Sequence, residues 1–408
     1  MDITSKTFLA VLKGTLSGET VDPGREVSPE EWQKLFDLAR IHQVLPLFYN
    51  AVYPYVTAPL GTEIRQSVRV QVMRQAVKTS EFLALNQQLQ AVGVKPLVMK
   101  GLICRELYPQ PDLRPSGDED VLIPADQFFR CHRVLRDFGM ETRLENPKDS
   151  YEVPYRKPES PLYIELHKHL FPPESAAYGD LNRFFKSARE RAVAEEIQGH
   201  TVYTMDYTDH LFYLICHAFK HFLHSGFGIR QVCDIILFAN RYGCRVDWQR
   251  ILKNCREIHA DKFAAAVLQI GSKYLVFDPE KAAYPAAWRK IRVDERAMLE
   301  DILSGGLYGD SNMSRKHSSN ITLEAVVSRK QGKKARHSVI ASVFPAAGKL
   351  EGRYPYLKKN PWLVPVAWCD RLWHYSRETG KNRENNAAEA LRIGKERVAL
   401  MREYGIVE

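Results

Sequence analysis

Apolar residues recur at helical spacing through the first part of the chain. In the long segment 64–92, for example, Phe82, Leu85 and Leu89 fall on one face, with polar residues between them. A repeat of about 3.6 residues is typical of amphipathic helices that pack one face against a core. We therefore expect residues 1–92 to form an N-terminal helical region.

The pattern changes at residue 93. Gly93 and Pro96 mark a turn, and the apolar run 97–99 that follows is typical of a buried strand. A short helix and a proline-interrupted loop come next. Further strand patterns are DEDVLI at 118–123, LYIELH at 162–167 and HTVYTM at 200–205. The mixture of strands and helices predicts a compact α/β unit over residues 93–205.

Strand patterns become rare after this unit. Residues 209–243 predict two amphipathic helices, separated by Gly226 and Gly228. We expect residues 206–408 to form a C-terminal helical domain. Taken together, the patterns predict an α+β fold in which the α/β unit stands between two helical regions.

The composition narrows the choice of ligand only slightly. The chain has 408 residues, and 58 Lys and Arg residues against 49 Asp and Glu residues give a net charge of +9. An excess of this sign favours anionic ligands such as nucleotides, nucleic acids or acidic lipids. The hydrophobic share of 45% is that of an ordinary globular protein, so function must be sought in particular sites.

Cysteine usage and hydrophobicity favour a cytoplasmic location. The seven cysteines are scattered and form no CxxC pair, which argues against a disulfide framework or a zinc knuckle. The N-terminus lacks the apolar core of a secretory signal, and no apolar stretch reaches the roughly 18 residues of a spanning helix. We expect a soluble, cytoplasmic protein with no membrane partner.

Two carboxylates two positions apart give the first candidate chemistry. In a strand, Asp118 and Asp120 project from the same side, about 7 Å apart. Magnesium usually combines a few carboxylates with phosphate oxygens, so a nucleoside triphosphate is a natural partner. Glu165 in LYIELH is the best candidate for a third carboxylate on a neighbouring strand. The opposing interpretation is that acidic residues at a strand edge are simply solvated, because so short a motif is common by chance.

A candidate phosphate-binding element lies upstream of the aspartates. Lys100 and Gly101 follow the predicted strand 97–99 and open the short helix. An ammonium group and a backbone amide at the positive end of a helix can hold phosphate oxygens. This context favours the catalytic interpretation of the aspartate pair.

The segment MKGLICRELYPQPDLRPSGDEDVLI, followed by a helix and then by IELH, resembles the uncharacterised bacterial nucleotidyltransferase family of the polymerase-β-like superfamily. The resemblance implies a mixed sheet flanked by helices. It also implies an enzyme that transfers a nucleoside monophosphate from a triphosphate to a hydroxyl-bearing acceptor and releases pyrophosphate. The acceptor stays open between a small molecule, a sugar and a protein, and a nucleic acid is not favoured.

The resemblance assigns roles to individual residues as well. Asp118 and Asp120 would hold Mg²⁺, or Mn²⁺ as the alternative ion, and Glu165 would complete the catalytic and metal-binding set. Lys100 and Gly101 would lie against the triphosphate, where the broader superfamily uses a Gly-Ser pair.

Glu119, between the two aspartates, departs from the family pattern, in which this residue is usually apolar. Strand alternation directs it to the opposite face, where an unpaired buried carboxylate would be costly. Either the strand is partly exposed at this point or a basic partner lies beneath it. The departure also supports an alternative function, a catalytically inactive module that binds a nucleotide or a partner protein on the same fold.

Weaker candidates lie outside this set. By the same resemblance Arg114 would clamp a phosphate, since its guanidinium offers a fixed bidentate fork. Four further residues are candidate substrate contacts, because they share the face of Glu165 or lie on the helix that follows: His167, His217, Lys220 and His221. A zinc site on these helical histidines is disfavoured by the absence of the glutamate of HExxH. The basic loop 328–338 could follow phosphates in a nucleic acid, although a solvated loop is the simpler interpretation.

Overall fold

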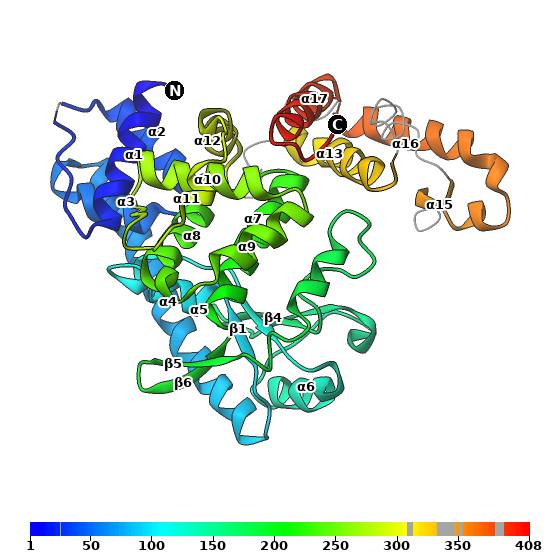
Figure 1. Ribbon diagram of the computed structural model, residues 1–408, viewed down its shortest axis with the longest axis horizontal. Coiled ribbons are helices and arrows are strands. Elements are labelled where there is room, and N and C mark those ends of the chain that lie inside the picture. The colour runs from blue at the N-terminus through cyan, green and yellow to red at the C-terminus, as the bar shows by residue number, and fades with distance from the viewer. Residues whose placement is uncertain (25, 308–312, 333–346, 351–353, 380–386) are drawn as a thin grey trace. The chain divides into compact units, whose positions relative to one another are not determined.

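The structure, a computed structural model, divides into two compact units (Figure 1). The first comprises residues 1–217 and 229–295, and the second comprises residues 218–228 and 296–408. The described residues are 1–24, 26–307, 313–332, 347–350, 354–379 and 387–408. The three-part organisation predicted from the sequence divides the chain by secondary structure, and its boundaries after residues 92 and 205 remain a prediction.

Four helices open the first unit, as the apolar periodicity predicts: α1 (Ile3–Leu16), α2 (Pro29–Ile41), α3 (Leu45–Val52) and α4 (Leu60–Ala91). Ser28 starts α2 through a capping box with Glu31, which satisfies backbone N–H groups that the helix cannot. The Phe48 ring packs 5.5 Å from the ring of Phe8 and 5.8 Å from that of Phe36. The N-terminal helical region is confirmed.

A four-stranded sheet follows, in the order β1-β2-β4-β3. Its strands are β1 (Leu97–Met99), β2 (Glu119–Leu122), β3 (Glu152–Arg156) and β4 (Tyr163–His167). β2 and β4 are parallel, whereas the other two pairings are antiparallel, so the mixed sheet is confirmed. A separate hairpin pairs β5 (Val193–Ile197) with β6 (His200–Thr204). The sequence patterns do not predict β3 or β5, and Asp118 lies just before β2 rather than inside it.

The register of β2 and β4 brings polar chemistry to one face of the sheet. Asp120 lies opposite Glu165, and Leu122 lies opposite His167. Because side chains alternate along a strand, these four residues share a face. The other face of β2, which carries Glu119, is buried.

Helices complete the first unit. They are α5 (Gly101–Arg105), α6 (Phe128–Asp137), α7 (Tyr207–His224) as far as His217, α8 (Ile229–Tyr242), α9 (Trp248–Glu257), α10 (Asp261–Tyr274) and the short α11 (Ala286–Arg289). The two helices expected within residues 209–243 are therefore present as α7 and α8. Trp248, Tyr284 and Trp288 pack together where α9 meets α11, and the Trp288 indole N–H donates to the Trp248 carbonyl at 3.2 Å.

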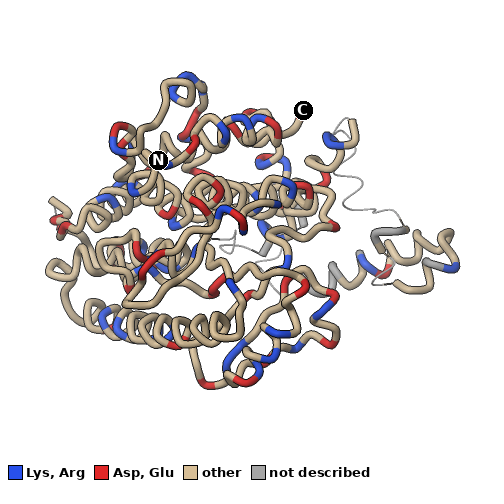
Figure 2. Tube along the Cα trace, turned by 60° about the horizontal axis from the view of Figure 1, so that its bottom comes forward, with Lys and Arg blue, Asp and Glu red and all other residues tan. Residues whose placement is uncertain are grey.

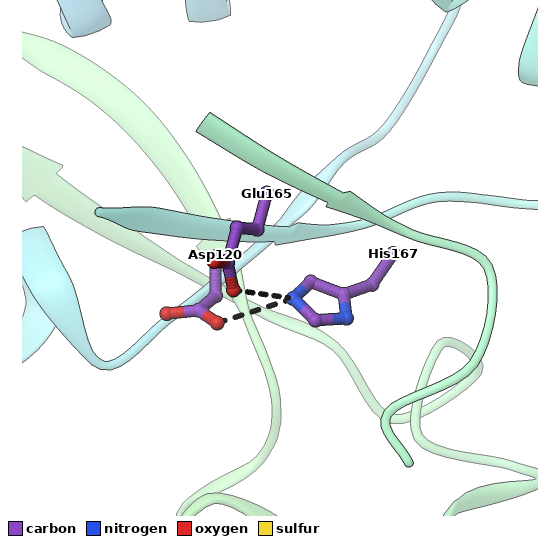
Figure 3. Close-up of side chains that lie close together, drawn as sticks. All are labelled: Asp120, Glu165 and His167. Carbon is purple, nitrogen blue, oxygen red and sulfur yellow. Dashed lines mark hydrogen bonds and ion pairs between the residues drawn. The ribbon is translucent and has the colours of Figure 1, made fainter. Parts of the chain in front are cut away.

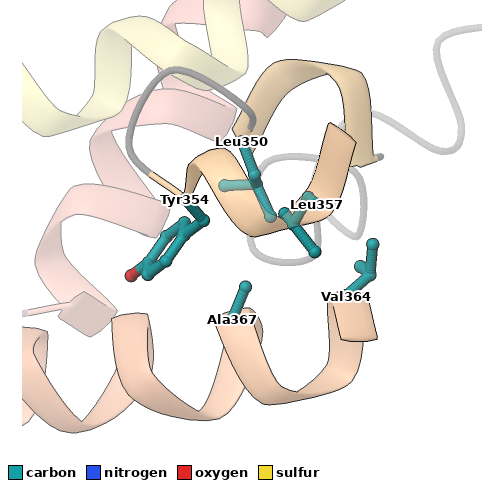
Figure 4. Close-up of a cluster of buried hydrophobic side chains, with 5 residues drawn as sticks. All are labelled: Leu350, Tyr354, Leu357, Val364 and Ala367. Carbon is teal, nitrogen blue, oxygen red and sulfur yellow. The ribbon is translucent and has the colours of Figure 1, made fainter. Parts of the chain in front are cut away.

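The second unit is helical in its described residues, and the C-terminal helical region is confirmed. Its helices are α12 (Glu295–Gly305), whose first residue belongs to the first unit, α13 (Met313–Lys330), α15 (Ala347–Leu350), α16 (Val364–Thr379) and α17 (Ala387–Glu403). Figure 4 shows a small core in which α15 and α16 meet: Leu350, Tyr354, Leu357, Val364 and Ala367. None of the helices in the described part of the chain is long and apolar enough to cross a membrane.

The proposed basic loop needs a correction. Residues 328–330 are the last residues of α13 and not a loop, because the helical pattern of this segment runs on through Lys330. Residues 333–338, with most of the positive charge, lie outside the described residues. Figure 2 shows basic and acidic residues interspersed along the chain, so the net charge of +9 is not confined to one segment.

Candidate active site

Three side chains from β2 and β4 converge on the polar face of the sheet (Figure 3). Asp120, Glu165 and His167 each offer one ligand atom, and these atoms all lie within 4.8 Å of one another. The His167 Nε2 atom lies 3.1 Å from Asp120 Oδ1 and 3.7 Å from Glu165 Oε2. Among the described residues this is the one group of three or more His, Cys, Asp or Glu side chains close enough to share a metal ion.

Lys100 reaches the same carboxylate from the end of β1. Its Nζ atom lies 2.8 Å from Asp120 Oδ2 and 3.0 Å from Nε2 of His217 on α7. The Lys100 backbone has φ of 47°, a left-handed conformation that side chains with a Cβ rarely adopt. Strained backbone of this kind persists where the surroundings fix it, and it is frequent at functional sites. The turn between β1 and α5 thus directs an ammonium group onto the polar face.

Electrostatics keep Asp120 ionised and His167 protonated. Burial alone would raise the pKa of Asp120, but the positive charge of Lys100 and the hydrogen bond from His167 outweigh it and hold the pKa well below its ordinary value. Burial alone would lower the pKa of His167, but its bonds to Asp120 and Glu165 raise it to about 9. At neutral pH His167 is therefore an imidazolium that donates to Asp120.

Glu165 is held differently. Burial raises its pKa, and the negative charges of Asp120, Asp118 and Glu152 raise it further, against a bond from His167 that lowers it. Glu152 comes from β3, opposite His167, and its Oε2 atom lies 3.7 Å from His167 Nδ1. Four carboxylates therefore act on one another here, and the site favours a cation.

Asp118 stands at the edge of this group. It is half-buried and does not belong to the set of three ligand atoms, but its charge raises the pKa of both Glu165 and Tyr163. Of the predicted carboxylate set, the structure thus brings Asp120 and Glu165 into direct proximity and leaves Asp118 within electrostatic range.

Glu119 has the buried basic partners that one of the two sequence-based alternatives requires. Its side chain is 0% exposed. Oε1 lies 2.6 Å from Arg105 Nη1 and 3.4 Å from Lys78 Nζ, and Oε2 accepts from the Leu102 amide at 2.8 Å. Burial raises the pKa of Glu119, but the charges of Arg105 and Lys78 lower it to about 2.

The same network fixes the loop before β2. The Lys78 ammonium donates to the Ser116 carbonyl and hydroxyl, both at 2.7 Å, and the Ser116 amide donates to Gln75 Oε1 at 3.0 Å. Lys78 and Gln75 belong to α4. The long N-terminal helix therefore holds the segment that leads into Asp118.

Two residues predicted to contact phosphate have partners inside the fold. A Cβ atom on Gly101 would lie 2.0 Å from Glu119 Oε2, so this glycine makes room for the buried carboxylate, and the next amide in α5 binds Glu119. Arg114 forms a buried bidentate pair with Asp234 of α8, at 2.8 and 2.5 Å, and Tyr108 donates to the same carboxylate. The Arg114 guanidinium is therefore directed at Asp234, whereas the predicted contact of the Gly101 amide with phosphate stays a prediction.

The candidate substrate contacts are divided between the two units. His167 belongs to the carboxylate group, and His217 contacts Lys100. Lys220 and His221 belong to the second unit. Glu152 and Tyr213 are additions that sequence patterns miss; the pKa of buried Tyr213 on α7 responds, after burial itself, to Lys100 and Asp120.

Comparisons with known proteins identify the family. The family model described as "Uncharacterised nucleotidyltransferase" matches residues 28–275, which include every residue of the carboxylate group. A crystal structure of an antigenic nucleotidyltransferase-like protein from Paracoccidioides brasiliensis is similar over 52% of this chain and 95% of that chain, with 14% identity and a TM-score of 0.30. No curated protein matches the chain.

Proposed function

Because the chain belongs to the uncharacterised nucleotidyltransferase family, we propose that it transfers a nucleoside monophosphate from a nucleoside triphosphate to a hydroxyl-bearing acceptor, with release of pyrophosphate. The observation that carries the proposal is the convergence of Asp120, Glu165 and Lys100 on one face of the sheet. The two carboxylates suit the metal ion of a metal-bound triphosphate, and the single ammonium suits its phosphate oxygens.

A divalent metal ion fits these donors. Asp120 and Glu165 present oxygen atoms within 4.8 Å of each other, and Asp118 stands near enough to alter the pKa of Glu165. We propose that these three carboxylates hold Mg²⁺, with Mn²⁺ as the alternative. When bound, the ion would neutralise the triphosphate and the charge that develops on the transferred group. Oxygen donors are the ligands that these hard cations prefer.

The protein's own side chains supply the rest. Lys100 and His167 neutralise Asp120 in the structure, and the Lys100 ammonium would contact phosphate oxygens when a cation is held by the carboxylates. Glu165, whose pKa is raised, accepts the proton of the acceptor hydroxyl. The acceptor oxygen then bonds to the α-phosphorus, and the bond from that phosphorus to the bridging oxygen breaks. Its electron pair leaves with pyrophosphate.

The experiment pairs each triphosphate and Mg²⁺ or Mn²⁺ with a cell extract and searches for a nucleotidylated product by mass spectrometry. We expect one product with the wild-type chain and none with Asp118→Asn plus Asp120→Asn. Asp137→Asn, an exposed change at the end of α6, is the matched control. Loss of product in the control, or persistence in the double variant, would overturn the assignment.

A catalytically inactive nucleotide- or partner-binding module is the second candidate. It is favoured by one observation: Arg114 pairs with the buried Asp234 rather than with the polar face. Calorimetry separates the two functions. Triphosphate binding that needs Mg²⁺ supports the enzyme, and binding that is unchanged without the metal supports the module.

We also propose a cytoplasmic location. All seven cysteines are free in the structure, and five of them are buried: Cys104, Cys131, Cys216, Cys233 and Cys255. Free thiols are typical of reducing compartments. The triphosphate substrate would be available there.

A further inference from the structure

A pocket of about 540 Å³ opens at the carboxyl ends of the parallel strands β2 and β4. Its lining includes Leu122, the last residue of β2, and Lys168, the residue after β4. Leu122 pairs with His167, so the pocket begins one residue beyond the carboxylate group. Ligands of α/β sheets commonly bind outside the carboxyl ends of parallel strands.

The far wall of the pocket is firmly built. It is formed by the 3-10 helix Gly179–Phe185 and the residues after it. The Asn182 side chain accepts from the Phe171 amide at 3.1 Å and donates to the Phe171 carbonyl at 2.8 Å. A Cβ atom on Gly179 would lie 2.6 Å from the Pro173 carbonyl oxygen, so the chain packs tightly here. The shape of the pocket is fixed by these local bonds.

The lining is basic. Asp180 is the single carboxylate of the lining. The four cationic residues are Lys168, Arg183, Lys186 and Arg189. Two of the cations have partners already. Lys168 donates to the Pro147 carbonyl at 3.3 Å, and Arg183 pairs with Glu257 at 2.6 Å.

Lys186 and Arg189 are different, because neither forms an ion pair with any residue that the structure describes. Lys186 is exposed, whereas Arg189 is half-buried; burial lowers the pKa of Arg189, and the negative charge of Asp126 only partly offsets this. A partly desolvated guanidinium without a carboxylate is costly unless a ligand supplies the anion. Together, the exposed Lys186 and the half-buried Arg189 match the charge of one phosphate dianion, and the guanidinium fork suits its oxygens.

The strand register distinguishes the two ends of the site. Lys100 follows Met99, which lies opposite Asp120, whereas Leu97 lies opposite Leu122. Lys100 is therefore at the amino end of β2 and the basic pocket at its carboxyl end, with Asp120 between them. In-line displacement requires the attacking and leaving oxygens on opposite sides of the phosphorus. The Lys100 end suits the triphosphate. The basic pocket is therefore available to the acceptor.

We propose that the acceptor is itself a phosphomonoester with a free hydroxyl, and that Lys186 and Arg189 bind its phosphate group. This inference rests on the proposed nucleotide transfer, and it names the chemical class of the second substrate. It predicts two separate anion sites on one chain, one dependent on the metal and one not.

Calorimetry on the full chain tests the pocket without any turnover. Ribose 5-phosphate and inorganic phosphate serve as probes for the basic pocket, and ATP with Mg²⁺ serves as the probe for the carboxylate site. We expect Lys186→Ala plus Arg189→Ala to weaken binding of both phosphate probes at least tenfold and to leave ATP binding within twofold. Lys253→Ala plus Arg256→Ala, which removes two exposed cations from α9, should change neither.

The outcomes separate this inference from the proposed function. If the pocket variant loses ATP instead of ribose 5-phosphate, the pocket holds the triphosphate and the inference is overturned. It is also overturned if the wild-type chain binds neither phosphate probe, or if a ten-nucleotide RNA without terminal phosphates binds and the probes do not compete with it. A chain that binds phosphate through Lys186 and Arg189 but transfers nucleotide only to acceptors without a phosphate group would overturn this inference and leave the proposed function standing. A chain that binds phosphate there but transfers no nucleotide to any acceptor would overturn the proposed function.

Discussion

The two faces of β2 treat neighbouring carboxylates in opposite ways. Glu119 is enclosed by Arg105, Lys78 and a backbone amide, all of which belong to the scaffold. Asp120 meets Lys100 and His167 on a face that retains solvent access, since the Glu165 side chain is 23% exposed. The difference between the faces lies less in the burial of the carboxylate than in whether its partners can be replaced by a ligand.

The balance of charge explains this difference. Glu119 is one carboxylate between two cations, and both cations also bind the Ser116 hydroxyl. Asp118, Asp120, Glu152 and Glu165 outnumber the cations on the other face, where the pKa of Glu165 is raised by burial and by its acidic neighbours. The first arrangement is complete without a ligand, and the second favours an added cation.

The largest effect should come from Asp120→Asn. Removal of this charge should reduce nucleotide transfer by about 100-fold or more, beyond the loss typical of groups that only orient a metal ligand. The stability of the metal-free protein should change less, because His167 keeps Glu165 and Glu152 within 3.7 Å and the Lys100 side chain is 12% exposed. Triphosphate consumption and urea unfolding measure the two quantities. An Asp120→Asn protein that unfolds at lower urea concentration but keeps its specific activity when folded would make Asp120 a scaffold residue like Glu119.

Glu119→Ala should act on folding instead. The substitution leaves Arg105 and Lys78 buried without their carboxylate, and loss of one partner from a buried ion pair costs about 3–5 kcal/mol. Urea unfolding monitored by circular dichroism gives the free energy. Glu145→Ala, in an exposed loop, is the control. Equal stability of the two variants would contradict the scaffold role.

Gly101→Ala should produce a smaller loss of the same kind. The added methyl group would lie 2.0 Å from Glu119 Oε2, and overpacking of this sort costs about 1–3 kcal/mol. Combining it with Glu119→Asp, which shortens the acid, should cost less than the sum of the two single changes. Gly117→Ala, with nothing within 4 Å of the added atom, should stay within about 0.5 kcal/mol of wild type. Strict additivity in the double variant would show that the two residues do not meet.

The smallest effect is a pH dependence on the polar face. The folded pKa of His167, about 9, exceeds its unfolded value of about 6.5. Its contribution to stability is therefore complete below pH 6.5 and is lost as pH rises through 9. In metal-free protein the stability difference between wild type and His167→Gln should shrink over that interval. A difference that grows with pH would reverse the assigned protonation state.

The sequence predicts the elements of the site better than its contacts. Strands 97–99 and 162–167 are evident from local apolar runs, and alternation alone places Glu119 opposite the aspartate face. The sequence does not predict β3, because Pro154 interrupts its pattern at the edge of the sheet. Glu152, which lies on β3, is therefore not predicted as a site residue. Local patterns predict which segments form strands, but they do not predict which residues of another strand will lie beside them.

Ion-pair partners show the same limit more sharply. Arg114 is a reasonable phosphate clamp by chemistry, yet its partner Asp234 lies 120 residues away and no local period connects them. Gly101 is a reasonable phosphate contact by motif, but the motif does not predict that a Cβ at this position would clash with Glu119. The sequence shows which chemical group a side chain carries, whereas the group that it neutralises depends on the completed fold.

The parallel pairing of β2 with β4 also has a consequence for the order of assembly. Asp120 and Glu165 become neighbours only after the chain has closed a loop of 45 residues, and loops of this kind form late. A refolding chain should therefore recover its helical signal before it recovers affinity for Mn²⁺. The lag between the two signals would measure when β4 pairs with β2. A ribosome-bound chain that ends before residue 165 would have no cation affinity of this kind.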